Sequence, residues 1–397
     1  MALRISGIGC SLIDNLYTNV SFSSENFRKY CSKKNGDGGL TPGKLAFRDN
    51  LSQFAGKDYA KILHDIVGEN PPDIVNIGGP AIVAMIHASQ LLNGEDVEIE
   101  FHGRYGNDEF GRTIMSFLNK TQVNTYYYKE IHGTTPSTDV FSDPVYNRGH
   151  GDRTFVNSIG VASDFKPEEI SPVFYRADLV FFGGTALLPR IHKGLTEILS
   201  KAKENNAVTV VGTAFDFINE QKSPDKRWPI GRGDESYPYI DLIITDHLEA
   251  LRLSGMKTKE KAAQFFQNKG AGACYITHGV EPIFFYSNGN LFKSCELTRR
   301  PISETLVNDL KIKTPNGDTT GCGDNFAGGI LASLAKQIFT YKKGELDMME
   351  ALAWGVASGG FACFYPGGMY SESVPGEKRE KIEYYVNKYK QQISFYK

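Results

Sequence analysis

The sequence lacks several features that mark common protein classes. Its six cysteines form no CxxC pair and its eight histidines no HExxH motif, so neither a zinc site of the usual spacing nor the commonest metalloprotease site is expected. The sequence contains no run of about 18 apolar residues, so no membrane helix is expected. The N-terminus has no basic region followed by an apolar run, as a signal peptide has. We therefore expect a cytoplasmic protein with reduced thiols.

An excess of either charge is also missing. Lys and Arg total 44 and Asp and Glu total 46, which gives a net charge of -2. Proteins that bind nucleic acid or anionic membranes usually carry a basic excess or patch, so neither partner is expected. The hydrophobic fraction of 41% and the charged fraction of 23% are ordinary for a globular protein.

Short apolar runs alternate with helical patterns along most of the 397 residues. The runs are predicted to be strands, at residues 3–8, 97–101, 179–182, 208–211, 242–244, 273–276 and 283–286. Helices are predicted at residues 81–92, 109–119, 191–205, 258–269, 324–337 and 348–364. This alternation predicts an α/β fold with a mostly parallel sheet and helices on both faces. Two segments depart from it, a polar stretch at 20–60 and a hairpin-like stretch at 134–157.

A glycine-rich turn that runs into an apolar helix carries the strongest chemical signal. Residues 318–329 read DTTGCGDNFAGG. Amide N–H groups at a helix start, with the helix dipole behind them, form an anion site that the glycines allow an anion to approach closely. Asp324, on the first turn of that helix, is placed to accept a proton from a hydroxyl that attacks a bound phosphate. The structural alternative is a tight turn with an Asp cap.

This segment resembles the second signature of the ribokinase-like (PfkB) carbohydrate kinase family, which usually reads DTTGAGD. Further matches follow in the family's order along nearly the whole chain, at residues 7–14, 78–81, 103–111 (GRYGNDEFG), 152–155 (DRTF), 246–249 (DHLE) and 277–279 (THG). The resemblance implies a three-layer α/β/α core of residues 1–13, 61–130 and 159–397. It also implies a discontinuous β lid of residues 14–24 and 131–158, and leaves 25–60 as an insertion.

The resemblance implies a role for each matching residue on the ATP side. Asp324 would be the catalytic base, and the amides of Gly321, Cys322 and Gly323 would form the anion hole. A Cys in place of the family's Ala should be harmless because the backbone makes the contact. Glu249 would hold Mg²⁺, directly or through water, beside Asp246, which replaces the family's Asn. The remaining implied positions are Thr277 and Gly279 at the phosphates or ribose, Ser358 and Gly360 near the adenine, and Asp318 at the K⁺ site that some members have.

On the acceptor side, the resemblance implies that Asp14 binds hydroxyls and that Gly78 and Gly79 let the backbone lie against the substrate. A buried carboxylate can accept from two neighbouring hydroxyls, which suits a polyol. Asn157 and Arg104 are further candidate contacts, and the alternative for Arg104 is an ion pair with Asp108 or Glu109. The family's Asn shortly after the two glycines is absent, because Pro80 and apolar residues follow.

The expected function is therefore transfer of phosphate from ATP·Mg²⁺ to the primary hydroxyl of a small sugar or sugar derivative. Two alternatives stay open, an adenosine-like nucleoside kinase and a catalytically silent sugar- or nucleotide-binding protein. The long span between Asp14 and Gly78 resembles that of adenosine-kinase-like members, whereas the DRTF strand resembles that of the sugar kinases. Lid sheets in this family often pair, so a homodimer through the lid is a further hypothesis.

Overall fold

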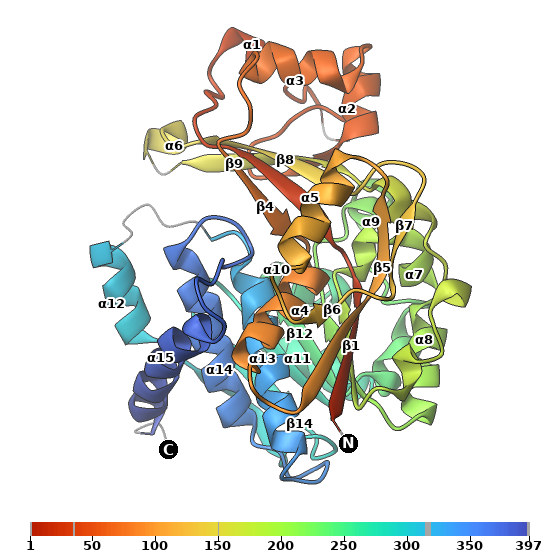
Figure 1. Cartoon of the computed structure of the whole chain (residues 1–397). Coiled ribbons are helices and arrows are strands. Elements are labelled where there is room, and N and C mark those ends of the chain that lie inside the picture. The colour runs from red at the N-terminus through yellow and green to blue at the C-terminus, as the bar shows by residue number, and fades with distance from the viewer. Residues whose placement is uncertain (1, 35, 150, 314–318, 395–397) are drawn as a thin grey trace.

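The computed structural model describes residues 2–34, 36–149, 151–313 and 319–394. A ten-stranded sheet forms the centre of the molecule (Figure 1). Its order is β15 (Cys295–Arg300), β14 (Ile283–Ser287), β13 (Ala273–Thr277), β12 (Leu242–Asp246), β11 (Val208–Gly212), β10 (Leu179–Gly183), β1 (Leu3–Gly9), β5 (Val97–Gly106) and β6 (Val123–Asn124), with β7 (Tyr128–Ile131) also on β5. Neighbours run parallel from β13 to β6, and β14 pairs antiparallel with β13 and β15.

Helices cover both faces of this sheet because its strands are apolar on both sides. In β10, Leu179 and Phe181 pack into one hydrophobic cluster, and Val180 and Phe182 pack into the other. The first cluster includes residues of α4 (Pro80–Leu91), α5 (Glu109–Leu118), α12 (Glu304–Lys313), α13 (Cys322–Ile338), α14 (Met348–Phe361) and α15 (Glu377–Ile393). The second includes residues of α7 (Pro189–Lys193), α8 (Leu195–Glu204), α10 (His247–Ser254) and α11 (Lys259–Asn268). The predicted α/β/α layering is thereby confirmed.

A separate five-stranded sheet, which we call the lid sheet, has the order β3 (Leu45–Phe47), β9 (Asp152–Ser158), β8 (Ser137–Asp143), β2 (Leu12–Tyr17) and β4 (Ile74–Gly78). Three helices lie over it, α1 (Glu25–Arg28), α2 (Arg48–Ala55) and α3 (Tyr59–Val67) (Figure 1). Tyr17 and Phe141 of the sheet share a buried cluster with Phe27, Leu51 and Ile62 of these helices. One face of the lid sheet is therefore covered from within the chain.

The lid sheet takes strands from beyond the two stretches expected from the sequence. β3 comes from the expected insertion at 25–60, and β4 comes from the stretch assigned to the core. The reason is pairing: β4 runs antiparallel to β2, and β3 runs parallel to β9. The predicted helix at 191–205 is likewise two helices, α7 and α8, which meet at Gly194.

Shorter elements connect these layers. They are α6 (Tyr146–Gly149), α9 (Phe217–Lys222), η1 (Gly160–Asp164), η2 (Pro167–Glu169), η3 (Phe174–Arg176), η4 (Thr185–Leu187), η5 (Asp234–Tyr239) and η6 (Ala362–Phe364). Among the residues that the structure describes, no helix is both long and apolar enough to cross a membrane.

Candidate active site

The glycine-rich turn forms the start of α13. Gly321 is its N-cap residue and has φ 76°, a left-handed conformation that favours glycine. A Cβ atom at Gly321 would lie 2.7 Å from the Cα of Gly368, whereas a Cβ atom at Gly323 would meet nothing within 4 Å. The amide of Cys322 donates to the carbonyl of Thr319 (3.3 Å) and closes the turn. The start of α13 thus offers first-turn amides beside open space at Gly323.

Asp324 lies on the first turn of α13, in a partly exposed position. Burial of its carboxyl group raises the pKa of Asp324 to about 6. Cys10 lies just after β1 and is buried. Burial raises the pKa of the Cys10 thiol, and the carboxylates of Asp14 and Asp324 raise it further. Both carboxylates therefore lie near one buried thiol at the carboxyl end of β1.

A row of polar side chains crosses the lid sheet at Asp14. Strand register pairs Asp14 with Asn76 of β4 and with Thr138 of β8, and pairs Thr138 with Asn157 of β9. Directly paired residues project from the same face of a sheet. The amide of Asn157 donates to the Thr138 hydroxyl (2.9 Å), and all four side chains are at most 8% exposed. We call these four residues the polar row.

The two glycines lie close to Asp14 and to Cys10. Gly78 lies against Asp14, and Gly79, with φ 103°, is the N-cap residue of α4. A Cβ atom at Gly79 would lie 2.6 Å from the carbonyl oxygen of Cys10. Asn76 does not replace the family's missing Asn, because its amide donates to the carbonyls of Pro366 (2.9 Å) and Met369 (3.3 Å).

Two strand ends bring the predicted nucleotide residues together. Asp246 at the end of β12 pairs with Thr277 at the end of β13, and Gly279 follows where a side chain would meet open space. The Asp246 carboxylate accepts from the amide of Glu249 (2.7 Å) and caps α10. This edge, at the carboxyl ends of parallel strands, is where open α/β sheets bind ligands.

Glu249 is a buried carboxyl group among other carboxylates. Burial raises the pKa of Glu249 to about 8, with further contributions from Asp246 and Asp324. The hydroxyl of Thr213, just after β11, donates to the Glu249 carboxylate. Sequence reasoning missed Thr213, whose only signal was its place after a predicted strand. Among the described residues no group of three or more His, Cys, Asp or Glu could hold a metal alone. The oxygens of Glu249 and Asp246 fit Mg²⁺, which accepts few carboxylates and keeps waters.

The expected adenine contact at Ser358 does not match its surroundings. Ser358 is 0% exposed, and a Cβ atom at Gly329 would lie 2.4 Å from its hydroxyl oxygen, so its side chain points into the packing of α14 against α13. Gly360 lies against Leu306 of α12, with a would-be Cβ 2.6 Å from the Leu306 side chain. Asp318, the expected K⁺ ligand, lies outside the described residues.

Arg104 is not part of the polar row. Its guanidinium group forms an ion pair with Glu169 and lies 5.4 Å from the centre of the Phe165 ring. These residues line a separate hollow of 370 Å³, together with His102. The ion-pair partner of Arg104 is thus Glu169, not the expected Asp108 or Glu109. Asp108 instead caps α5 by accepting a hydrogen bond from the amide of Gly111.

A contact that sequence reasoning missed joins the lid to the glycine-rich turn. Arg153 of β9 donates to the hydroxyls of Thr319 (2.8 Å) and Thr320. The DRTF segment therefore reaches from the lid sheet to the residues just before the anion site.

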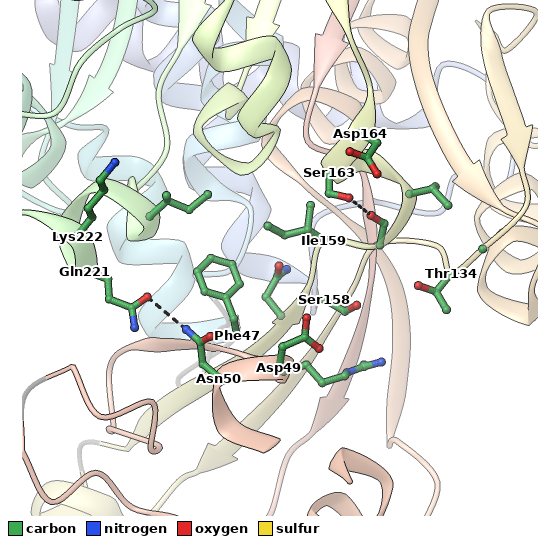
Figure 2. A pocket seen from close by; sticks show the side chains of 16 residues that line it. Phe47, Asp49, Asn50, Thr134, Ser158, Ile159, Ser163, Asp164, Gln221 and Lys222 are labelled. Atoms are coloured by element: carbon green, nitrogen blue, oxygen red, sulfur yellow. Dashed lines mark hydrogen bonds between the residues drawn. The ribbon is translucent and has the colours of Figure 1, made fainter. Parts of the chain in front are cut away.

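A cavity of 890 Å³ opens at the far end of the polar row, between the lid sheet and the core (Figure 2). Asn157 lines it together with Phe47, Asn50, Thr134, Ser158, Ile159, Ser163, Asp164, Ile218, Gln221 and Lys222. Asn50 of α2 donates to Gln221 of α9 (3.2 Å) across it. Asp324 is not among its lining residues, so the cavity does not contain the predicted base.

Known proteins of similar sequence or fold include several kinases. The chain is 22% identical to adenosine kinase 2 of Arabidopsis thaliana over 277 residues, 66% of this chain and 73% of the relative. It is also 22% identical to a fructokinase of Vibrio alginolyticus over 311 residues, 77% of this chain and 91% of the relative. The structure of Arabidopsis thaliana ribokinase complexed with ribose and ATP has the same fold, with a TM-score of 0.64 at 14% identity, covering 97% of this chain and 98% of the other.

A family model supplies the assignment itself. The model of the pfkB family of carbohydrate kinases matches residues 73–375, which include β4, the two glycines and the whole glycine-rich turn. Members of this family are phosphotransferases. The chain belongs to the pfkB carbohydrate kinase family.

Proposed function

We propose that this protein transfers the γ-phosphoryl group of ATP to the primary hydroxyl of a sugar or sugar derivative, with Asp324 as the base. The observation that carries the proposal is that the carboxylates of Asp14 and Asp324 both raise the pKa of the buried Cys10 thiol, which puts both near it, and that Asp324 stands on the first turn of α13. Asp14 would orient an acceptor hydroxyl toward Asp324, and the amides would face the phosphoryl group. The ribose and ATP held by the similar ribokinase support this pair of substrates.

Asp324 has the properties that proton abstraction requires. A pKa of about 6 leaves its carboxylate ionised at neutral pH and only weakly acidic when protonated, which is the range in which a general base works well. When the acceptor oxygen attacks the γ-phosphorus, its proton passes to Asp324 and the bond to the β-phosphate oxygen breaks. Transfer is direct and in line, so no phosphoenzyme forms.

The start of α13 would stabilise the negative charge that spreads over the equatorial phosphoryl oxygens. Glu249 and Asp246 would hold Mg²⁺ through oxygen atoms and water, and the ion would neutralise charge on the ATP phosphates. The potassium requirement of some family members would involve Asp318, and it stays a prediction for this chain.

The polar row favours a sugar-like acceptor. Asp14, Thr138 and Asn157 form a continuous line of hydroxyl, amide and carboxylate groups, which matches the closely spaced hydroxyls of a polyol. The cavity beyond Asn157 has the volume of a typical small-molecule site, so a sugar carrying a substituent is favoured over a bare sugar.

A nucleoside is the second candidate acceptor. The aromatic ring of Phe47 and the aliphatic side chains of Ile159, Val161 and Ile218 line the same cavity, and such surfaces suit a base. The similar adenosine kinase supports this candidate. A homodimer through the lid also stays a prediction. Because α1–α3 cover one face of the lid sheet, a partner would have to use the edge strands β3 or β4 or the helices themselves.

A panel of sugars, deoxy-sugars, polyols and nucleosides, assayed for ADP release, tests the proposal. With the best acceptor, Asp324→Asn should lower kcat by about 10²–10⁴-fold while the affinity for ATP stays within about threefold. Asp225→Asn, on the exposed surface, is the matched control and should behave as wild type. Near-normal turnover of Asp324→Asn would refute the assigned base. Absence of ADP above the hydrolysis background with every acceptor would instead favour a silent binding protein.

A further inference from the structure

A buried lysine lies close behind the anion site. Lys378, on the first turn of α15, is only 1% exposed. Its Nζ donates to Oδ1 of Asn325 (3.0 Å) and to Oε1 of Gln90 (3.1 Å). It also lies 5.4 Å from the ring centre of Tyr365 and 5.8 Å from that of Tyr370. Lys378 therefore joins α15 to α13 and α4 through polar contacts inside the core.

The contact with Asn325 leads directly to the anion site. Asn325 follows Asp324 in α13, and its Nδ2 donates to the carbonyls of Gly321 (2.9 Å) and Gly368 (2.9 Å). Its Oδ1 accepts from Lys378 and from the hydroxyl of Tyr365 (3.0 Å). Two donors at Oδ1 fix which end of the amide faces the two carbonyls, because the reversed amide would direct its oxygen at them. Lys378 and Tyr365 together therefore fix how Asn325 holds Gly321.

Residues 365–370 lie between η6 and α15 in the chain, and we call them the strap. They contact the start of α13 on one side and strand β4 on the other. Gly321 lies against Gly368 of the strap, with a would-be Cβ only 2.7 Å from its Cα. Asn76 of the polar row donates to the carbonyl of Pro366, and Gln90 donates to the carbonyl of Tyr370 (2.8 Å). Asn76, Gln90 and Asn325 thus hold the strap from three elements, and Lys378 bridges Gln90 and Asn325.

Burial of a lysine at this position costs free energy, and the need to fill the space does not explain why a lysine is there. Removal of an ammonium group from water disfavours its charged form, and burial lowers the pKa of Lys378 well below its usual range. A methionine would fill similar space without that cost. What methionine could not do is donate hydrogen bonds to Asn325 and Gln90 at once.

We propose that Lys378 is a positioning residue for phosphoryl transfer, which holds Asn325 and the strap so that Gly321 and the first turn of α13 keep the geometry of the anion site. The inference rests on the proposed function for its catalytic readout. An anion site acts mainly in the transition state, so loss of its geometry should reduce kcat more than substrate affinity.

The first experiment compares two lysine variants on the same helix. Lys378→Met keeps the side-chain length and removes the donors, and it should lower kcat by about 10–100-fold while both KM values stay within about threefold. Lys390→Met is the matched control, because Lys390 donates to Glu350 (2.7 Å) at the other end of α15, and its kcat should be unchanged. A folded Lys378→Met protein with wild-type kcat would overturn the proposal.

The second experiment asks whether Lys378 acts through Asn325. If it does, kcat of the double variant Lys378→Met/Asn325→Ala should be little lower than kcat of the more damaged single variant. The reason is that both changes act on the same group, the side-chain amide of Asn325. Multiplicative losses would contradict the proposal. Tyr365→Phe removes only the second donor to the same Oδ1 and is the milder variant if Lys378→Met does not fold. It should lower kcat by about threefold without changing either KM, and an unchanged kcat would count against the proposal.

The third experiment does not depend on turnover. Amide hydrogen exchange in peptides covering 319–327 and 365–370 should be about tenfold faster in Lys378→Met than in wild type, and unchanged in Lys390→Met. Wild-type exchange in both segments of Lys378→Met would refute the positioning role. If no acceptor is ever phosphorylated while hydrogen exchange in these peptides is still faster in Lys378→Met, the proposed function fails. The positioning of the strap and of the first turn of α13 by Lys378 then still holds.

Discussion

The backbone of Gly78 lies so close to the carboxylate of Asp14 that a Cβ atom at position 78 would stand 2.0 Å from Oδ2. Gly78→Ala should therefore displace the Asp14 side chain and raise the KM for the acceptor by about tenfold or more. The KM for ATP, measured in the same assay, is the internal control and should stay near its wild-type value. An unchanged KM for the acceptor would remove Asp14 from the acceptor site.

The pH dependence of turnover should reflect Asp324. The base must be ionised to accept a proton, and its pKa is raised to about 6, so kcat/KM for the acceptor should increase with pH, level off above about 7 and fall tenfold per unit below 5. Rates measured between pH 5 and 8 in buffers of constant ionic strength test this. A flat profile through pH 6 would show that another group limits the reaction.

Glu249 should make the fold less stable as pH rises. Its carboxyl group ordinarily loses its proton near pH 4.5, but in the fold it retains the proton up to about pH 8. The unfolded chain is therefore favoured increasingly between those values. Glu249→Gln should raise the free energy of unfolding by on the order of 2 kcal/mol at pH 9 and change it little at pH 4.5, in urea titrations without Mg²⁺. A difference that does not vary with pH would contradict this account.

Cys322→Ala should leave turnover within about twofold of wild type. The proposed anion site would use backbone amides, and the Cys322 thiol contacts Cys363, with the two sulfur atoms 3.2 Å apart. Steady-state kinetics with and without a reducing agent check this expectation. A large loss would give the thiol a role that the amides do not explain.

The layered core could be predicted because its signals are local. The runs at 3–8, 179–182 and 208–211 became β1, β10 and β11, since each is a short run rich in apolar residues next to a turn. Strand β4 escaped prediction because Asp73, Asn76 and the glycines dilute its apolar pattern, and only its pairing with β2 makes it a strand. Tertiary pairing of this kind is not visible in a short window.

The candidate site also contains residues that the sequence identified and features that it could not show. Asp324, Asp14 and Glu249 stand in motifs, and the structure places them on the first turn of α13, within β2 and on the first turn of α10. The burial of Ser358 could not be foreseen, because its position along the chain does not say which face of α14 it occupies.

Residues far apart in sequence were harder still. Lys378 and Gln90 lie 288 residues apart, and neither belongs to a motif, so nothing in the sequence connected them. Their hydrogen bond exists only because α15 packs beside α4 and α13, which is decided by the whole core.

The contact of Arg153 with Thr319 and Thr320 has a thermodynamic consequence for the two substrates. Arg153 belongs to the sheet that carries the polar row, and the threonines belong to the turn that would face the phosphates. If binding of the acceptor to the lid sheet and binding of the nucleotide to the turn each strengthened this one contact, the two binding events would be coupled. Linkage then requires their effects to be mutual, so that whichever substrate binds first increases the affinity for the second by the same factor.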